Sequence, residues 1–186
     1  MRVPDLHTPR LTIRELRLTD LESVHAALNA AWGEDEPVEA RRTWLEWTVR
    51  SYSELANLHQ PPYGERAIVL RESGALIGAV GLVPSFGPWE QLPSLGGAPP
   101  EPLTCTPAFG LYWAVSPNYQ GQGLATEAAR ALIVWARSEL HVGRIVATTT
   151  NANLASQAVM RKLGMRLERN PWPEPPWFET VGILDP

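Results

Sequence analysis

Apolar residues in the first part of the chain recur first at strand spacing and then at helix spacing. Residues 11–17 alternate between apolar and polar side chains, which predicts a strand. Apolar residues then recur three and four positions apart, which predicts a helix with Thr19 or Asp20 as its N-cap. A longer helical pattern follows Pro37 and continues to about Leu58. The chain is therefore expected to open with a strand and two helices.

Strands and helices alternate through the rest of the chain. A hairpin is predicted from the strand-like runs at 65–70 and 76–83, which are joined by the turn-forming residues 72–74. The later expected elements are a strand at 109–115, a helix from 124 to about 140, a strand at 143–150, a helix at about 153–163 and two more strands separated by a loop rich in proline and tryptophan. This order predicts an α/β fold with a mixed sheet, formed as a single domain by residues 1–186.

Residues 84–107 have a different composition from their surroundings. Seven prolines and three glycines fall in this window, so regular helix or strand is not expected there. A structureless connection of this length is unusual in a compact domain and is often functional. Two interpretations stay open: a lid or specificity loop, and a Pro-rich surface loop without a role.

Composition excludes several classes of function. The chain has 186 residues, 44% of them hydrophobic, and a net charge of −4, with its basic residues scattered, so nucleic acid is not an expected partner. No apolar run is long enough to span a membrane, and the first residues lack the apolar block of a secretory signal. Cys105 is the sole cysteine and has no charged neighbours, which is typical of an ordinary loop cysteine in a cytoplasmic protein. No spacing of histidine, cysteine and acidic residues suggests a metal site.

The loop at residues 120–126 connects the apolar strand at 109–115 to an alanine-rich amphipathic helix. A helix start presents unpaired N–H groups and the positive end of the helix dipole. Gly121 and Gly123 let a ligand approach this backbone closely, and no acidic residue appears before Glu127. The loop is therefore predicted to bind a phosphate or pyrophosphate group.

Two common nucleotide-binding motifs do not fit this loop. A Walker loop ends in Gly-Lys-Ser/Thr, and no lysine lies between residues 120 and 126. The dinucleotide fingerprint needs a third glycine and an acidic residue at the end of the next strand, whereas the strand expected at 143–150 ends in threonines. An unrelated nucleotide-binding protein is therefore disfavoured.

Two motifs and both ends of the chain resemble one family, in the same order along the sequence. These segments are Leu11–Arg14, Gln120-x-x-Gly123-x-Ala125, Asn153-x-x-Ser156, Lys162–Met165 and Trp177–Val181. They resemble the GCN5-related N-acetyltransferases (GNAT family), in the branch that acetylates protein N-termini such as those of ribosomal proteins. The resemblance implies a twisted mixed sheet whose fourth and fifth strands part to admit the pantetheine arm of acetyl-CoA, with no metal involved.

The resemblance also implies contacts between the phosphate loop and acetyl-CoA. The expected diphosphate donors are the backbone N–H groups of Gly121, Gln122, Gly123, Leu124, Ala125 and Thr126. The backbone near Val115 is expected to hold the pantetheine and to polarise the thioester carbonyl. Gln120 is expected either to cover the phosphates or to face solvent.

The second motif supplies the expected contacts to the reacting end of the donor. Asn153 is placed by the resemblance to hydrogen-bond the pantetheine; the alternative is an N-cap, which we disfavour because Asn151 or Thr150 could cap the helix instead. Ser156 is the candidate donor to the leaving sulfur, although a serine in a first helical turn is often merely solvated. Arg130 could reach the 3′-phosphate but is better interpreted as a surface charge, and the same holds for Lys162.

The usual proton-transfer residues of the family are absent. Many members carry a tyrosine as general acid where this chain has Met160, a thioether that cannot donate a proton. The branch commonly has a glutamate as general base where this chain has Gly110. Glu90, Glu101 and His59 are alternative bases, but no motif supports any of them, so the general base is left unassigned.

The acceptor is indicated only by aromatic and acidic residues. Trp32, Trp44 and Trp47 could form aromatic walls for a peptide N-terminus or a bulky amine, and residues 34–36 are acidic, which would attract a cation. The alternatives are core tryptophans and a solvated helix start. The expected acceptor is an amine-bearing small molecule or a protein N-terminus, with no nucleic-acid or membrane partner, and a homodimer is one assembly left open.

Two functions of different classes are compatible with the sequence. The favoured hypothesis is an acetyl-CoA-dependent N-acetyltransferase in which a primary amine attacks directly in a ternary complex. The alternative is a non-catalytic module that binds or senses CoA, motivated by Met160 and Gly110. Asn153 and Ser156 favour the enzyme, because positioning alone can accelerate attack on a thioester greatly.

Overall fold

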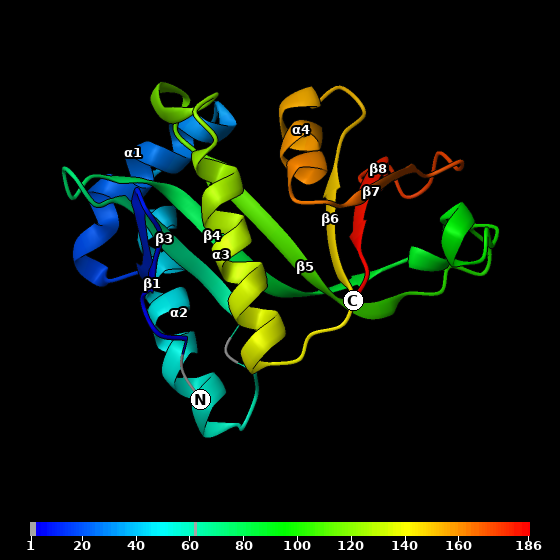
Figure 1. Ribbon diagram of the computed structural model, residues 1–186, viewed down its shortest axis with the longest axis horizontal. Coiled ribbons are helices and arrows are strands. Elements are labelled where there is room, and N and C mark those ends of the chain that lie inside the picture. The colour runs from blue at the N-terminus through cyan, green and yellow to red at the C-terminus, as the bar shows by residue number, and fades with distance from the viewer. Residues whose placement is uncertain (1–2, 62) are drawn as a thin grey trace. The chain divides into compact units, whose positions relative to one another are not determined.

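The computed structural model of the chain describes residues 3–61 and 63–186 (Figure 1). Its contacts divide the chain into two compact units, a first unit of Met1–Leu82 with Tyr112–Leu140 and a second unit of Val83–Leu111 with His141–Pro186. The strands β4 (Leu76–Gly87) and β5 (Thr106–Val115) each run from one unit into the other.

The sheet of the first unit is antiparallel. Its strands follow the order β1 (Leu6–His7), β2 (Leu11–Glu15), β3 (Gly64–Leu70) and β4. In the register, Ile13 lies opposite Ile68, and Ala67 lies opposite Ala79, with a bulge after Ile68. The expected hairpin between β3 and β4 is confirmed.

Helices cover both faces of this sheet. The helices of the first unit are α1 (Leu21–Trp32), α2 (Val38–Asn57) and α3 (Leu124–Glu139). Helices α1 and α2 lie against one face and α3 against the other (Figure 1). A buried cluster on the α1–α2 face contains Leu16, Leu28, Leu45, Ala67 and Ala79. Leu28 and Leu45 are among the apolar positions whose spacing predicts the two helices.

Asp20 is the N-cap residue of α1, as one of the two expected candidates, but its side chain serves another purpose. It occupies the N-cap position of α1, but its side chain makes no capping hydrogen bond. Its carboxylate instead accepts from Arg14 Nη1 and Nη2 at 2.7 and 2.8 Å and from the Arg17 N–H at 2.8 Å. Residues Leu18–Asp20 form a 3-10 turn before α1. The predicted N-cap position is therefore confirmed, but its side chain does not cap the helix, because the partly buried Arg14 guanidinium binds the same oxygens.

We expect Asp20→Asn to lower the free energy of unfolding by about 2 kcal/mol, because it leaves the Arg14 guanidinium without its anion. Although burial opposes ionisation, the hydrogen bonds from Arg14 and Arg17 lower the pKa of Asp20 below its ordinary value. Stability from this pair is therefore present above the unfolded-state pKa of about 4 and is lost as the pH falls through the lower folded-state pKa. Urea denaturation at pH 7 and pH 3 tests this: the wild type should lose more stability than Asp20→Asn. Asp35→Asn, at an exposed carboxylate, should behave as the wild type does.

The second unit contains a mixed sheet and a short helix. The strand order is β5, β6 (Ile145–Thr149), β8 (Thr180–Leu184) and β7 (Arg166–Arg169), and the helix is α4 (Leu154–Lys162). The strands β6, β8 and β7 pair antiparallel. Parallel pairing of β5 with β6 is recorded only at Phe109–Ile145 and Gly110–Val146. Such a short pairing agrees with the expectation that these two strands part.

The Pro-rich segment contributes to the core of the second unit. Residues 84–107 are not irregular throughout, because β4 continues to Gly87, β5 starts at Thr106, and 3-10 turns form at Trp89–Gln91 and Pro93–Leu95. Trp89 and Leu92 are buried with Phe178. The proline and glycine content of the segment does not show that its apolar residues pack into a hydrophobic core, so the sequence predicts only an irregular loop. The fold class, an α/β fold with a mixed sheet, is confirmed, whereas a single domain over residues 1–186 stays a prediction.

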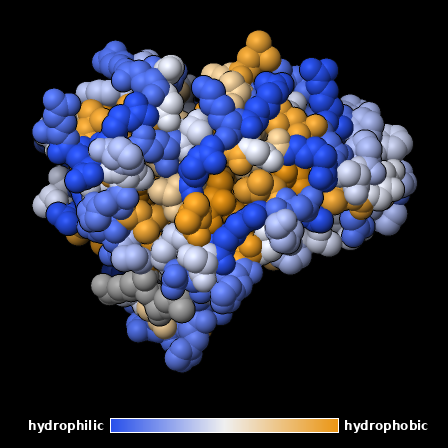
Figure 2. Space-filling model, in the orientation of Figure 1, coloured by the Kyte–Doolittle hydropathy of each residue, from blue (hydrophilic) through white to orange (hydrophobic). Residues whose placement is uncertain are grey.

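Apolar side chains are not confined to the two cores. Figure 2 shows hydrophobic residues among hydrophilic ones on the face that it displays. The described large apolar side chains with the highest exposed fractions are Trp47 and Leu58 in the first unit and Phe86 and Leu154 in the second. Scattered side chains of this kind are normal on a folded protein and indicate no particular partner.

Candidate functional site

The loop at residues 120–126 lies between the end of β5 and the start of α3 in the first unit. A 3-10 turn, Pro117–Tyr119, follows β5, and α3 begins at Leu124. Gly121 and Gly123 have φ values of 73° and 79°, in the left-handed region that glycine adopts at little cost. The first helical hydrogen bond runs from the Glu127 N–H to the Gly123 carbonyl at 3.0 Å. The amides before Glu127 therefore have no acceptor within the helix.

Other described segments of the first unit do not crowd these glycines. A Cβ atom at Gly121 would meet nothing within 4 Å, and one at Gly123 would meet only Arg10 Nη2, at 3.7 Å. Gly121 and Gln122 are exposed, whereas Leu124 is buried and fixes the start of the helix. The loop thus combines a rigid base with an accessible backbone, as an anion-binding loop requires.

Gln120 is exposed, as the solvent-facing alternative expects, and its side chain also binds the main chain. Its Nε2 donates to the Val115 carbonyl at 2.8 Å, so it ties the loop back to the end of β5. The Ser116 N–H next to Val115 donates to the Ile77 carbonyl on β4 at 2.9 Å. In the first unit, Gln120 therefore fixes the position of the loop relative to the strand that precedes it.

Asn153 and Ser156 lie in the second unit, at the start of α4. Asn153 is the N-cap, and its Oδ1 accepts from the Ser156 N–H at 3.0 Å. The N-cap interpretation is thus confirmed, and the reason for disfavouring it is wrong: Asn151 is occupied elsewhere, accepting from Thr180 Oγ1 at 2.7 Å. The cap uses only the oxygen of the Asn153 amide. Its Nδ2 and the Ser156 hydroxyl take no part in the bond.

Met160 and Gly110, which stand where the resemblance implies an acid and a base, are both closely packed in the second unit. Met160 is fully buried, and a Cβ on Gly182 would lie 3.0 Å from its sulfur. A Cβ on Gly110 would lie 3.1 Å from the Cβ of Ser85. A glutamate at Gly110 would therefore have to displace Ser85. Glu90, one of the alternative bases, is exposed, so its position does not favour it as the general base.

A partly buried carboxyl group that sequence reasoning missed lies on β3. Glu65 is partly covered, and burial raises its pKa above the ordinary value. The Tyr52 hydroxyl accepts from the Leu16 N–H at 3.1 Å and donates to the main-chain carbonyl of Glu65, not to its carboxyl group. Burial also raises the pKa of Tyr112, whose hydroxyl has no partner among the described residues. A carboxyl with a raised pKa is the kind that can serve as a general base. In the sequence, Glu65 is marked only as a charged residue within a run of strand-like residues.

The tryptophans and acidic residues considered for the acceptor partly serve the structure. The Arg41 guanidinium is buried, 5.5 Å from the centre of the Trp32 ring and 5.2 Å from that of Trp44. Glu36 forms an ion pair with Arg41. Trp47 remains 63% exposed. Half of this group therefore contacts Arg41, whereas Trp47 and the acidic residues 34 and 35 stay exposed.

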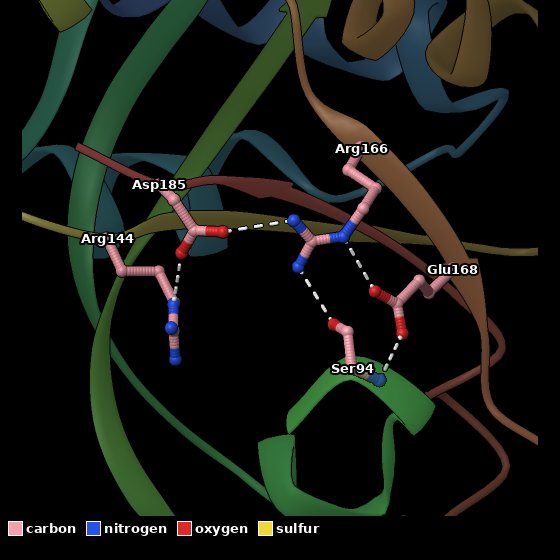
Figure 3. A network of polar contacts seen from close by, with 5 residues as sticks. All are labelled: Ser94, Arg144, Arg166, Glu168 and Asp185. Carbon is pink, nitrogen blue, oxygen red and sulfur yellow. Dashed lines mark hydrogen bonds and ion pairs between the residues drawn. The ribbon is translucent and has the colours of Figure 1, made fainter. Parts of the chain in front are cut away.

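Arg166 on β7 is the centre of a polar network that holds the Pro-rich segment (Figure 3). Its Nη2 donates to Ser94 Oγ at 2.8 Å, and its Nε donates to Glu168 Oε1 at 2.8 Å. Glu168 in turn accepts from the Ser94 N–H at 3.0 Å. Asp185 accepts from Arg166 Nη1 at 3.1 Å and from Arg144 Nε at 2.8 Å. The network therefore fixes the segment at Ser94.

Further contacts fix the segment on either side of Ser94. Trp89 Nε1 donates to the Thr106 carbonyl at 2.8 Å, and the Trp89 ring packs edge-on against Phe178 with centres 5.4 Å apart. Asn170 Nδ2 donates to Gln91 Oε1 at 3.0 Å. The first half of the Pro-rich segment is thus packed against the rest of the second unit, to which all of residues 84–107 belong. A lid, which stays a prediction, would be restricted to the residues after Ser94.

Neither metal nor membrane chemistry has support in the described residues. Histidine, cysteine and acidic side chains form no group of three suited to a metal ion within residues 3–61 and 63–186. No helix in the same part of the chain is both long and apolar enough to cross a membrane. Cys105 is exposed and unpaired by any disulfide.

Comparison of the sequence with known families identifies the family to which the loop and α4 belong. The acetyltransferase (GNAT) domain family matches residues 10–166, which include the loop and α4. The chain belongs to the GNAT acetyltransferases. The family suspected from the two motifs is therefore confirmed, and with it an acetyltransferase enzyme.

Relatives of this GNAT protein agree with that assignment. The chain is 29% identical over 162 residues to the uncharacterized N-acetyltransferase YnaD of Bacillus subtilis, covering 87% of this chain and 82% of the relative. An acetyltransferase structure from Agrobacterium tumefaciens covers 100% of the chain and 96% of its own length, with a TM-score of 0.71 and 21% identity. A structure of RimL, the ribosomal L7/L12 alpha-N-protein acetyltransferase, in complex with coenzyme A has a TM-score of 0.60 and 18% identity, covering 95% and 93%. At such identities, the structural likeness shows that the fold is shared.

Proposed function

We propose that this GNAT protein transfers an acetyl group from acetyl-CoA to a primary amine, by direct attack in a ternary complex. The observation that carries the proposal is the loop at 120–126. It presents amides without helical acceptors, beside glycines in the left-handed region that leave the backbone open.

The residues present fit the diphosphate of CoA. The N–H groups of residues 121–126 would hold it at the positive end of α3, and the Gln120–Val115 hydrogen bond would keep the loop in place. Asn153 Nδ2 and the Ser156 hydroxyl are the proposed donors to the pantetheine and the sulfur. When bound, acetyl-CoA supplies an activated acyl group that a neutral amine can attack, with loss of the thiol.

Positioning is the main proposed source of catalysis. Met160 and Gly110 offer no proton-transfer group, so alignment of the amine with the thioester has to lower the barrier. The general base stays unassigned; Glu65, whose pKa is raised by burial, is one candidate.

A protein N-terminus is the proposed acceptor class. The RimL structure that shares this fold is named for an α-N-protein acetyltransferase, and the exposed Trp47 offers an apolar surface for a peptide. A homodimer remains a further expectation. The alternative function is a CoA-binding module without catalysis, favoured by the missing acid and base.

A thiol-release assay separates the two functions. The full chain is incubated with acetyl-CoA and a panel of peptides with free N-termini, the same peptides with blocked N-termini, polyamines and aminoglycosides. We expect release of CoA with at least one free amine and no acceleration by the blocked peptides. Calorimetric binding of CoA without turnover on any acceptor would establish the binding module instead. Absence of CoA binding would overturn both.

A further inference from the structure

Arg10, which precedes β2, forms a brace between the N-terminal segment and the phosphate loop. Its Nη1 donates to the Gln122 carbonyl at 3.0 Å. Its Nε donates to Glu127 Oε2 at 2.7 Å, and its Nη2 lies 2.6 Å from the same oxygen. Glu127 also accepts from Thr8 Oγ1 at 2.6 Å and from the Arg10 N–H at 3.0 Å. All of these residues belong to the first unit.

The brace connects the loop to the first turn of α3. Gln122 lies within the loop, whereas Glu127 lies one turn into the helix. A single planar guanidinium bonds to both, so it restricts how far the carbonyl of Gln122 can move relative to the helix axis. Its position beside Gly123, where a Cβ would stand 3.7 Å from Nη2, places this restriction at the amides that face a ligand.

The brace also neutralises the negative charge of Glu127 beside the loop. Although burial opposes ionisation, the hydrogen bonds from Thr8 and Arg10 lower the pKa of Glu127, so this carboxyl is charged at neutral pH. Without Arg10, a bare carboxylate would lie in the first turn of the helix that receives the diphosphate. Like charges in that position repel, and the repulsion would weaken anion binding.

We propose that Arg10 is a positioning residue for CoA: it fixes the Gln122 carbonyl against Glu127 and so presets the amides of the loop for the diphosphate. This inference rests on the proposed function, because it concerns how the same loop binds its donor. All three guanidinium nitrogens are already engaged by protein atoms. These contacts take three of its five N–H groups and join the loop to the helix, so we assign Arg10 a role that acts through the loop.

The first test compares Arg10→Ala with Arg42→Ala. Arg42 is a matched control, because its side chain is 50% exposed and ion-paired to Glu39, against 48% for Arg10. Both variants lose one positive charge. We expect calorimetry to show CoA binding weakened about tenfold by Arg10→Ala, the size of one charge-assisted hydrogen bond, and unchanged by Arg42→Ala.

The second test uses a donor that lacks the diphosphate. Arg10→Ala should raise the KM for acetyl-CoA about tenfold with little change in kcat, and it should leave kcat/KM for S-acetyl-pantetheine unchanged. A merely structural role would lower activity with both donors. If Arg10→Ala does not fold, Arg10→Lys serves in the same assays: it keeps the charge without the fork geometry, so it should show most of the defect.

A double-variant cycle with Glu127→Gln tests the coupling. If Arg10 and Glu127 act as one brace, the double variant should bind CoA no more weakly than Arg10→Ala alone, because Glu127→Gln breaks no further contact of the brace and removes the carboxylate that Arg10→Ala leaves bare. Additive losses, or wild-type affinity in Arg10→Lys, would overturn the proposal and leave Arg10 as a source of charge only. Equal CoA affinity in Arg10→Ala and the wild type would overturn it while the proposed function stands. Absence of CoA binding by the wild type would overturn both.

Discussion

Replacing Gly78 by alanine should lower the free energy of unfolding by more than about 3 kcal/mol, because the new methyl group has no space. Gly78 lies in the buried part of β4. A Cβ there would overlap the Ala114 carbonyl oxygen and stand 2.9 Å from the Cα of Val115. Both are main-chain atoms of β5, so no rotation of a side chain can relieve the clash. The two strands would have to move apart.

Gly143→Ala is the matched control for this substitution. A Cβ at Gly143 would lie 3.8 Å from the nearest atom, the Pro186 Cγ, which is ordinary van der Waals contact. Its effect should stay within about 0.5 kcal/mol. Urea denaturation of the variants beside the wild type measures both. If Gly78→Ala were as stable as Gly143→Ala, the close approach of β4 to β5 would be refuted.

The same substitution should also impair the loop. Val115 ends β5, and its carbonyl accepts the Gln120 hydrogen bond that holds the loop at the strand. A displacement of β5 would therefore move the loop as well. We expect any Gly78→Ala protein that still folds to bind CoA more weakly, whereas Gly143→Ala should bind it as the wild type does.

Elements defined by a local pattern could be predicted from the sequence. In α3, the apolar positions Leu124, Ala128, Leu132 and Trp135 are all buried, as their helical spacing indicates. The loop before this helix could be located for the same reason, since its glycines interrupt two strong periodic patterns. Burial of one face of an element is encoded within that element, so its own residues suffice.

Choices between hydrogen-bond partners could not be predicted in the same way. Asp20 is at an expected N-cap position, yet its side-chain oxygens bind Arg14 from the preceding strand. Arg10 and Glu127 are 117 positions apart, so no local pattern joins them. Asn153 had equally good capping competitors nearby, and Thr180 on β8 decides among them by binding Asn151. Each outcome depends on a partner that only the folded chain supplies.

Gly123→Val should weaken CoA binding by about 100-fold, the largest effect on binding that we expect. At a φ of 79°, a β-branched residue is strained by about 1–3 kcal/mol, so the loop would tend to leave its present conformation. A valine side chain would also stand where the diphosphate is proposed to meet the amides, beside Arg10 Nη2. Together these losses correspond to about 2.7 kcal/mol of binding free energy. Calorimetric titration with CoA measures the change.

Gly33→Val separates strain from a specific effect on the loop. Gly33 follows α1 in the same unit with a φ of 68°, and a Cβ there would meet nothing within 4 Å. The two variants should therefore lose similar stability in thermal unfolding, because both force a branched residue into the left-handed region. Only Gly123→Val should lose affinity for CoA. If both variants bound CoA equally well, the diphosphate could not lie against residues 121–126, and the proposed mode of donor binding would have to be abandoned.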